Sequence, residues 1–273
     1  MIAPASGRRA DGGGGVIVSL SSVRGSPGVT SWSLLLASAW PRTSELERVV
    51  VEADADGGVL AARYGLGVDP GVAALVAACR RHRGGPVGLE LDEVARRIAE
   101  GVWVVPAPES AERSMPVWGS CMDEVATVAA RDDRVWLVDC GRLSRASPAL
   151  AFASRCELAV VVCGPGQEDL VSVPSRLANL QRAGAAAAGV LVVGRVDYGL
   201  AELRSFFGTA LVWQVRSVRD LPALAKLVLT SRRARRTWVW REAVEVAAEI
   251  ADRLEGAAPR QALTGPGAVS GDG

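Results

Sequence analysis

The sequence predicts an α/β domain in which a mostly parallel sheet carries helices on both faces. Short runs of Val, Leu and Ile alternate with stretches of helical character and with turns rich in Gly, Ser, Pro and Asp. Strands separated by helices at this spacing pair in parallel, because each helix returns the chain to the same edge of the sheet. Hydrophobic residues make up 49% of the chain, as buried parallel strands require.

The expected strands are short apolar runs that stop at residues typical of turns. They cover 16–20, 49–51, 103–105, 135–138, 158–162, 189–193 and 211–215. The third run stops at Pro106 and Pro108, since proline has no N–H to donate to a strand ladder. The fifth run is closed by Gly164, Pro165 and Gly166.

Helices are expected in the segments that join these strands. They cover 30–39, 71–81, 92–100, 122–130, 169–182 and 237–254, and two more begin near 59 and 221. Together these elements predict one domain over 16–255. The segments 1–15 and 256–273 are rich in Gly and are expected to be disordered tails.

The charge balance and the cysteines exclude several classes of protein. A net charge of +1 gives no overall attraction to nucleic acid or anionic membrane, so such a contact needs a local patch. Five scattered cysteines and a single histidine, His82, do not support a disulfide framework, a zinc site or a Ser/His/Asp triad. No apolar run approaches the roughly 20 residues that span a bilayer. We therefore expect a cytoplasmic protein, at most peripheral at a membrane.

The turn after the first strand has the composition of a phosphate-binding loop. It reads R-G-S-P-G-V-T-S over 24–31. Gly25 and Gly28 free the backbone to turn its N–H groups toward an anion, and the following helix adds its positive end. Thr30 places a hydroxyl where such loops hold a Mg²⁺ ligand. Taken alone, the pattern also fits a plain turn in which Thr30 caps the helix.

Two further turns carry carboxylates at strand ends. The second strand ends in E-A-D-A-D-G-G over 52–58, and the fourth ends at Asp139. Carboxylates placed there can hold Mg²⁺ or orient an attacking water. Each turn alone also fits a solvated acidic loop or a chance match. Because ligands of parallel sheets bind beyond the carboxyl ends of the strands, the order of all three turns favours a single site.

With these three turns, the sequence resembles the MinD/ParA group of deviant-Walker P-loop ATPases, which includes the CpaE relatives of pilus assembly. The P-loop of that family reads K-G-G-x-G-K-[ST]-[ST], in register with 24–31. The stretch "VVVEADADGGVLAARYGLGVDPGVAAL" is similar to the family's second strand and helix, and "VWLVDCGRL" to its Walker-B segment. The resemblance covers about 16–226 and implies a P-loop NTPase fold of the SIMIBI/MinD-like type.

The resemblance also implies ATP and Mg²⁺ as cofactors. Mg²⁺ would be held by Thr30 and Asp139, and Arg24 and Asp54 would be the catalytic residues. The nucleotide would be bound by P-loop residues, namely Gly25, Ser26, Gly28, Val29, Thr30 and Ser31.

The sequence departs from the family at positions that matter for phosphate binding. Arg24 and Val29 stand where the family has two lysines. An arginine keeps the charge and can grip phosphate, whereas a valine cannot. Gly194 and Arg195 stand where the family has an adenine-contacting Asn. The single lysine, Lys226, lies too far along the chain to be assumed a replacement.

Two functions are consistent with this pattern. The first is an ATP-binding homodimer that forms with nucleotide and positions or partitions a cargo, such as a chromosome, plasmid, septum or pilus machinery; if active, it is an ATPase. The second is a non-hydrolysing scaffold or adaptor of a secretion or pilus-assembly system.

A basic segment near the C-terminus adds a further expectation. Its arginines can contact DNA or an anionic membrane surface, or can form a solvated face whose neighbouring tryptophans pack on the domain. The residues concerned are Arg232, Arg233, Arg235, Arg236, Trp238 and Trp240.

Overall fold

The computed structural model of the chain describes residues 15–24, 27–41, 46–81, 88–119, 121–144 and 146–256. Except for Gly15 and Gly256, both expected tails lie outside these ranges, as does His82. The expected domain boundaries and the disorder of the tails therefore stay predictions.

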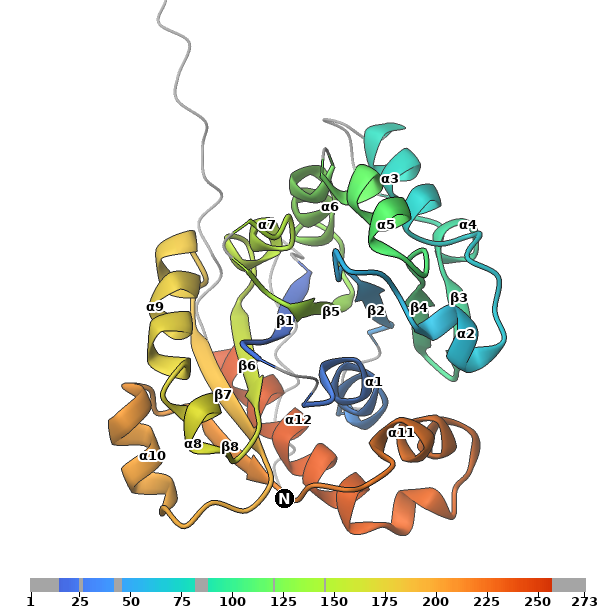
Figure 1. The fold of residues 1–273 in the computed structure, drawn as a ribbon. Helices are drawn as coiled ribbons and strands as arrows, with labels where there is room; N and C mark the ends of the chain where they lie inside the picture. Colours follow the sequence, from blue (N-terminus) through green and yellow to red (C-terminus); the bar gives the residue numbers. More distant parts are fainter. Residues whose placement is uncertain are drawn as a thin grey trace, which may run out of the picture.

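An eight-stranded sheet runs through the middle of the molecule (Figure 1). Its strand order is β3-β4-β2-β5-β1-β6-β7-β8, and all neighbours pair in parallel except β3 and β4. The strands are β1 (Val16–Ser22), β2 (Arg48–Glu52), β3 (Arg96–Ala99), β4 (Val102–Val105), β5 (Val135–Arg142), β6 (Leu158–Cys163), β7 (Ala188–Val193) and β8 (Val212–Val215). The expected mostly parallel sheet is confirmed.

Helices cover both faces of this sheet. Those of the described chain are α1 (Val29–Ala39), α2 (Leu60–Tyr64), α3 (Val72–Arg81), α4 (Leu91–Val94), α5 (Ala111–Trp118), α6 (Met122–Ala129), α7 (Leu150–Ala153), α8 (Gln167–Leu170), α9 (Val173–Ala183), α10 (Leu200–Phe207), α11 (Leu221–Thr230), α12 (Trp238–Gly256) and the 3-10 helix η1 (Ala234–Arg236). Helices α1, α11 and α12 pack on one face, and α3, α6, α7 and α9 on the other (Figure 1).

Alternate side chains of each strand enter the two cores. Ile17 and Val51 belong to the core that includes α3 and α6, whereas Val18 and Val50 belong to the core that includes α1. All four side chains are fully buried. Each such burial contributes about 1.5–3 kcal/mol to stability. Burial on both faces therefore fixes the strands and aligns their carboxyl ends along one edge.

The cysteines lie in the core as small residues. All five are buried: Cys79, Cys121, Cys140, Cys156 and Cys163. Burial raises the pKa of the Cys140 thiol well above its usual range. A thiol held in its neutral form is a poor nucleophile and a poor metal ligand.

The expected helix over 92–100 is wrong. Helix α4 ends at Val94, and β3 then pairs antiparallel with β4 through a turn at Glu100 and Gly101. Gly101 has a φ of +64°, and a Cβ there would lie 2.7 Å from Nη1 of Arg48. The turn thus requires glycine. Pairing with β4 outweighs the helical propensity of the R-R-I-A run, because propensity is weak compared with tertiary contacts.

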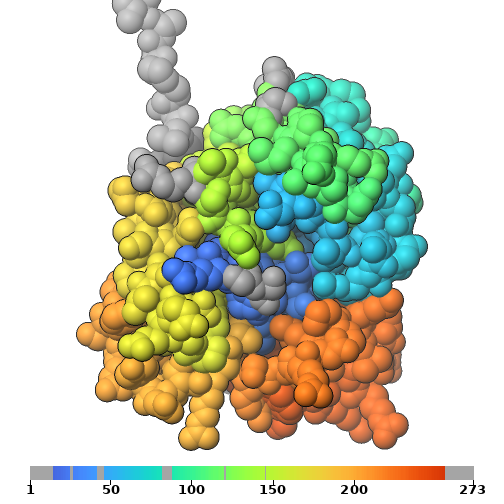
Figure 2. All heavy atoms as spheres, in the orientation of Figure 1, coloured from blue at the N-terminus to red at the C-terminus, as the bar shows by residue number. Residues whose placement is uncertain are grey.

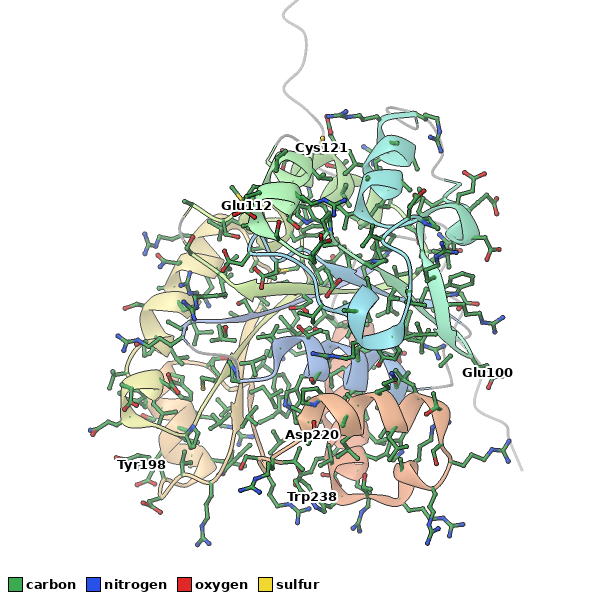
Figure 3. The ribbon with its side chains drawn as sticks, turned by 45° about the vertical axis from the view of Figure 1, so that its right-hand side comes forward. Glu100, Glu112, Cys121, Tyr198, Asp220 and Trp238 are labelled. Atoms are coloured by element: carbon green, nitrogen blue, oxygen red, sulfur yellow. The ribbon has the colours of Figure 1, made fainter. Side chains whose placement is uncertain are left out.

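The remaining differences concern segments between strands and one strand end. The expected helix over 169–182 is divided into α8 and α9. Helices α5, α7 and α10 are not expected from the sequence; α5 has Glu112 in its first turn and Pro116 in its interior (Figure 3). Strand β5 continues past Asp139 to Arg142, with an irregular register against β1. The order of the three turns that carry the candidate site is unchanged.

Candidate functional site

The three turns singled out in the sequence meet at one edge of the sheet. Strands β2, β5 and β1 are neighbours, and Asp139 of β5 lies in register with Leu20 of β1 and Glu52 of β2. Figure 2 shows the blue residues around the end of β1 and the start of α1 near the centre of one face, between the cyan and the orange segments. The strand order thus brings the ends of all three turns together.

Helix α1 begins with an open N-terminus. Gly28 precedes it in the left-handed region (φ 94, ψ 32) and has no side chain with which to cap the helix, and the first turn of the helix contains no acidic residue. A Cβ on Gly28 would lie 2.7 Å from Cδ2 of Leu221, so both the backbone and the packing require glycine. An uncapped helix N-terminus favours an anion. Gly25 and Ser26 lie outside the described residues, and their contacts with nucleotide stay predictions.

Thr30 and Asp139 form a pair below this N-terminus. Asp139 is 2% exposed, and Gly141 donates its N–H to Oδ1 of Asp139 over 3.1 Å. Burial raises the pKa of the Asp139 carboxyl to about 6, opposed by the nearby Thr30 hydroxyl and by the hydrogen bond from the Gly141 N–H. A hydroxyl and a carboxylate side by side at the start of a helix are a donor set suited to Mg²⁺.

Asp54 lies beside this pair. Its carboxylate accepts the N–H of Asp56 over 2.9 Å and packs against Gly141, where a Cβ would lie 1.7 Å from Oδ2 of Asp54. Burial raises the pKa of Asp54, while the charge of Arg142 lowers it. Asp54 also raises the pKa of Asp139, which shows that the two carboxylates share one electrostatic environment.

Glu52 is a buried brace whose role is not evident from the sequence. It is 2% exposed and accepts three backbone N–H groups, from Val59 (2.6 Å), Leu60 (2.9 Å) and Ala107 (3.0 Å). Burial raises its pKa to about 7. Glu52 therefore joins the end of β2 to the start of α2 and to the segment after β4. It fixes the turn that carries Asp54 rather than facing a ligand.

Arg63 of α2 is a second residue that the sequence does not single out. Its charge lowers the pKa of Asp139. Its Nη1 atom is buried and has no hydrogen-bond partner within the described part of the chain. A lone arginine in a short helix gives no sequence signal, because its neighbourhood depends on tertiary contacts.

The positions of the two family lysines differ in environment. Val29 is 6% exposed and belongs to the apolar cluster that includes Trp32, Leu60 and Leu221. Arg24 is exposed. The valine has thus become part of the core, while the arginine is free to reach a ligand.

Three other predicted positions are placed as follows. Ser31 follows Thr30 in α1 and is 1% exposed. Gly194 has a φ of +132°, and a Cβ there would lie 2.8 Å from Cγ of Pro165, so an Asn would not fit without rearrangement. Lys226 donates from Nζ to the carbonyl oxygen of Arg63 over 2.7 Å. The single lysine therefore holds α2 through its backbone.

Comparison with known proteins finds the same fold in solved structures of low sequence identity. No protein-family model matches the sequence, and no curated protein matches it significantly. A ParA family ATPase from Chlorobium tepidum has a TM-score of 0.70 at 16% identity, over 86% of this chain and 98% of that chain. MinD from Pyrococcus horikoshii, in complex with Mg-ADP, has a TM-score of 0.69 at 18% identity, over 88% and 97%.

A Cyanothece McdA variant in complex with ATP is also similar, with a TM-score of 0.63 at 10% identity, over 90% of this chain and 99% of that chain. These likenesses confirm the expected P-loop NTPase fold of the MinD/ParA type. At such low identities they concern the fold, and the chemistry has to be argued from the residues of this chain.

Proposed function

We propose, from a fold shared with MinD and ParA ATPases, that this chain is a Mg–ATP-dependent switch that dimerises on binding nucleotide and so positions or partitions a cargo. The observation that carries the proposal is the Thr30 hydroxyl beside the buried carboxylate of Asp139, at the start of α1 where Gly28 provides no side-chain cap. In P-loop proteins this combination binds Mg²⁺ and phosphate at once.

The residues present fit such a ligand. The open N-terminus of α1 would bind phosphate oxygens, and Thr30 and Asp139 would hold Mg²⁺. Within the described ranges, no group of three His, Cys, Asp or Glu side chains could hold a metal alone. This agrees with an ion that takes its other ligands from phosphate and water. Bound Mg²⁺ would neutralise phosphate charge, and Asp54 would orient a water molecule.

A second candidate function is a non-hydrolysing scaffold or adaptor of a secretion or pilus-assembly system. The burial of Val29 in the core favours it, because no charge approaches the phosphates from that position. Removing one preorganised donor to a transition state costs about 10²–10³ in rate. We therefore expect slow turnover even where nucleotide binds, and Arg24 is the P-loop residue left to supply charge.

The basic segment carries a proposal of its own, a contact with DNA or an anionic membrane surface. Arg232, Arg233 and Arg236 are exposed and line a shallow cavity of about 430 Å³. The two tryptophans of the basic segment contact arginine side chains. Arg235 of the segment lies 5.4 Å from the Trp240 ring, and Arg216 lies 4.1 Å from the ring of Trp238, which Figure 3 labels.

These ring contacts favour a charge contact over insertion of the tryptophans into a bilayer. In the described segments, no helix is both long and apolar enough to cross a membrane.

The nucleotide switch is tested by the mass of the protein in solution. Sedimentation would be measured without nucleotide, with Mg-ADP and with a non-hydrolysable ATP analogue plus Mg²⁺. We expect a dimer with the analogue alone and none for Thr30→Ala, whose helix α1 lacks the Mg²⁺ ligand. The same mass under all three conditions would contradict the nucleotide switch and would favour the scaffold function.

A further inference from the structure

Arg63 lies in an unusual environment for an arginine. Its Nη1 atom is buried from solvent without a hydrogen-bond partner among the residues described. A buried guanidinium nitrogen that lacks a partner forfeits the interactions it would have with water. An anion that is not part of the chain would supply the missing acceptor once the Arg63 side chain turned this nitrogen toward solvent.

The helix that carries Arg63 is held in place from both ends. Glu52 accepts the N–H groups of Val59 and Leu60, where α2 begins. On the other side, Nζ of Lys226 donates to the carbonyl oxygen of Arg63 and lies 5.7 Å from the Tyr64 ring. Contacts with β2 and α11 therefore fix the backbone of Arg63, as a preorganised binding group requires.

The carboxylate of Asp139 does not act as the partner of Arg63. No ion pair within 4.0 Å joins the two described side chains, although Arg63 affects the electrostatics of Asp139. Asp139 instead accepts the N–H of Gly141, and the Thr30 hydroxyl lies beside it and lowers its pKa. Arg63 therefore lies near the proposed metal ligands, and its Nη1 atom forms no hydrogen bond with their side chains.

We propose that Arg63 binds the metal-bound phosphates of the nucleotide and supplies, from α2 of the same subunit, the positive charge that the buried Val29 cannot supply. This inference rests on the proposed nucleotide function. The planar guanidinium suits phosphate because it presents parallel N–H donors to two oxygens. This charge would thus reach the phosphates from the side of β2, in addition to any charge from Arg24 of the P-loop.

The test is titration of a fluorescent ATP analogue, with Mg²⁺, into wild type, Arg63→Gln, Arg63→Lys and the control Arg204→Gln. Arg204 is exposed on α10 and matches the loss of charge. We expect Arg63→Gln to weaken binding at least about tenfold, since a hydrogen bond to a charged group is involved. Arg63→Lys should lose less affinity, because lysine keeps the positive charge but lacks the planar guanidinium with its parallel donors. Arg204→Gln should bind the analogue with the wild-type affinity.

A thermal unfolding scan without nucleotide accompanies the titration. Because Nη1 has no partner in the chain, Arg63→Gln should unfold within a few degrees of wild type, which a purely structural arginine would not allow. If the Gln variant folds poorly, Arg63→Lys carries the comparison. Wild-type binding with unchanged affinity in Arg63→Gln overturns this inference and leaves the proposed function standing. Failure of wild type to bind at millimolar nucleotide overturns both.

Discussion

The hydroxyl of Thr30, in the first turn of α1, lies beside the carboxyl group of Asp139 in the buried strand β5 and lowers the pKa of that carboxyl. The two side chains belong to turns more than a hundred residues apart that parallel pairing of β1 and β5 brings together. The same contact fixes a hydroxyl and a carboxylate as ligands for one cation. Structure and proposed chemistry therefore depend on a single pair.

Replacing Thr30 by valine should destabilise the protein by about 1–3 kcal/mol at pH 8, because the buried Asp139 carboxylate loses the neighbouring hydroxyl that favours its charged form. Thr30→Ser keeps the hydroxyl and should stay close to wild type. Urea unfolding of the three proteins measures the difference. Equal stability of the Val and Ser variants would show that the hydroxyl does not stabilise the carboxylate.

Glu52 should make stability depend on pH. Its folded-state pKa is raised from 4.5 to about 7 by burial. The folded protein therefore keeps a proton that the unfolded chain has lost between these values, and stability falls as pH rises from 4.5 to 7. Asp139, raised from 3.8 to about 6, acts in the same direction at lower pH.

The pH effect is measured by urea unfolding at pH 5 and pH 7.5. The free energy of unfolding of wild type should fall by about 2–3 kcal/mol from pH 5 to pH 7.5, by the usual relation of pKa shift to free energy. Glu52→Gln does not titrate and should lose clearly less, whereas the exposed control Glu245→Gln should follow wild type. A Glu52→Gln variant with the wild-type pH profile would rule out this assignment.

Gly28 and Leu221 should be energetically coupled. Gly28→Ala places a Cβ in the left-handed region and 2.7 Å from the Leu221 side chain, which we expect to cost about 1–3 kcal/mol. Asp220, labelled in Figure 3, caps α11 by accepting the N–H of Ala223 over 3.1 Å and so holds Leu221 in place.

A double-mutant cycle with Leu221→Ala separates the clash from the backbone strain. The cost of Gly28→Ala should fall by about 1 kcal/mol in the Leu221→Ala background. Strictly additive changes in the free energy of unfolding would mean that the methyl group introduced by Gly28→Ala does not clash with Leu221 in the single variant.

Restoring a lysine should reveal whether the rest of the site is competent. Val29→Lys places an ammonium group at the start of α1 and should raise ATP hydrolysis at least about tenfold, at some cost in thermal stability. Val29→Met matches the length of the side chain without the charge and should leave the rate unchanged. Phosphate release measures both. Identical rates in the two variants would favour the scaffold function.

Most of the strands can be predicted from the sequence because burial on both faces leaves uninterrupted apolar runs, such as V-V-V at 49–51. β3 could not be predicted, since it lies at the edge of the sheet and its R-R-I-A run carries no apolar signature. Its conformation is imposed by Gly101 and by pairing with β4.

The candidate site divides in the same way. Thr30, Asp54 and Asp139 can be proposed from the sequence, because each lies where a strand gives way to a turn and parallel topology brings such positions together. Glu52 and Arg63 cannot, because their roles depend on contacts with Ala107 and Lys226, which are distant in sequence. Such contacts cannot be predicted from the local sequence.

The central claim, that Thr30 and Asp139 form a Mg–nucleotide site, is tested most directly by calorimetric titration of Mg-ATP into wild type, Asp139→Asn and the exposed control Asp252→Asn. We predict micromolar binding by wild type and by the control, and a loss of at least about tenfold in Asp139→Asn, because a charged metal ligand is removed. Absence of binding by wild type at millimolar Mg-ATP, or equal affinity in Asp139→Asn, would contradict the account.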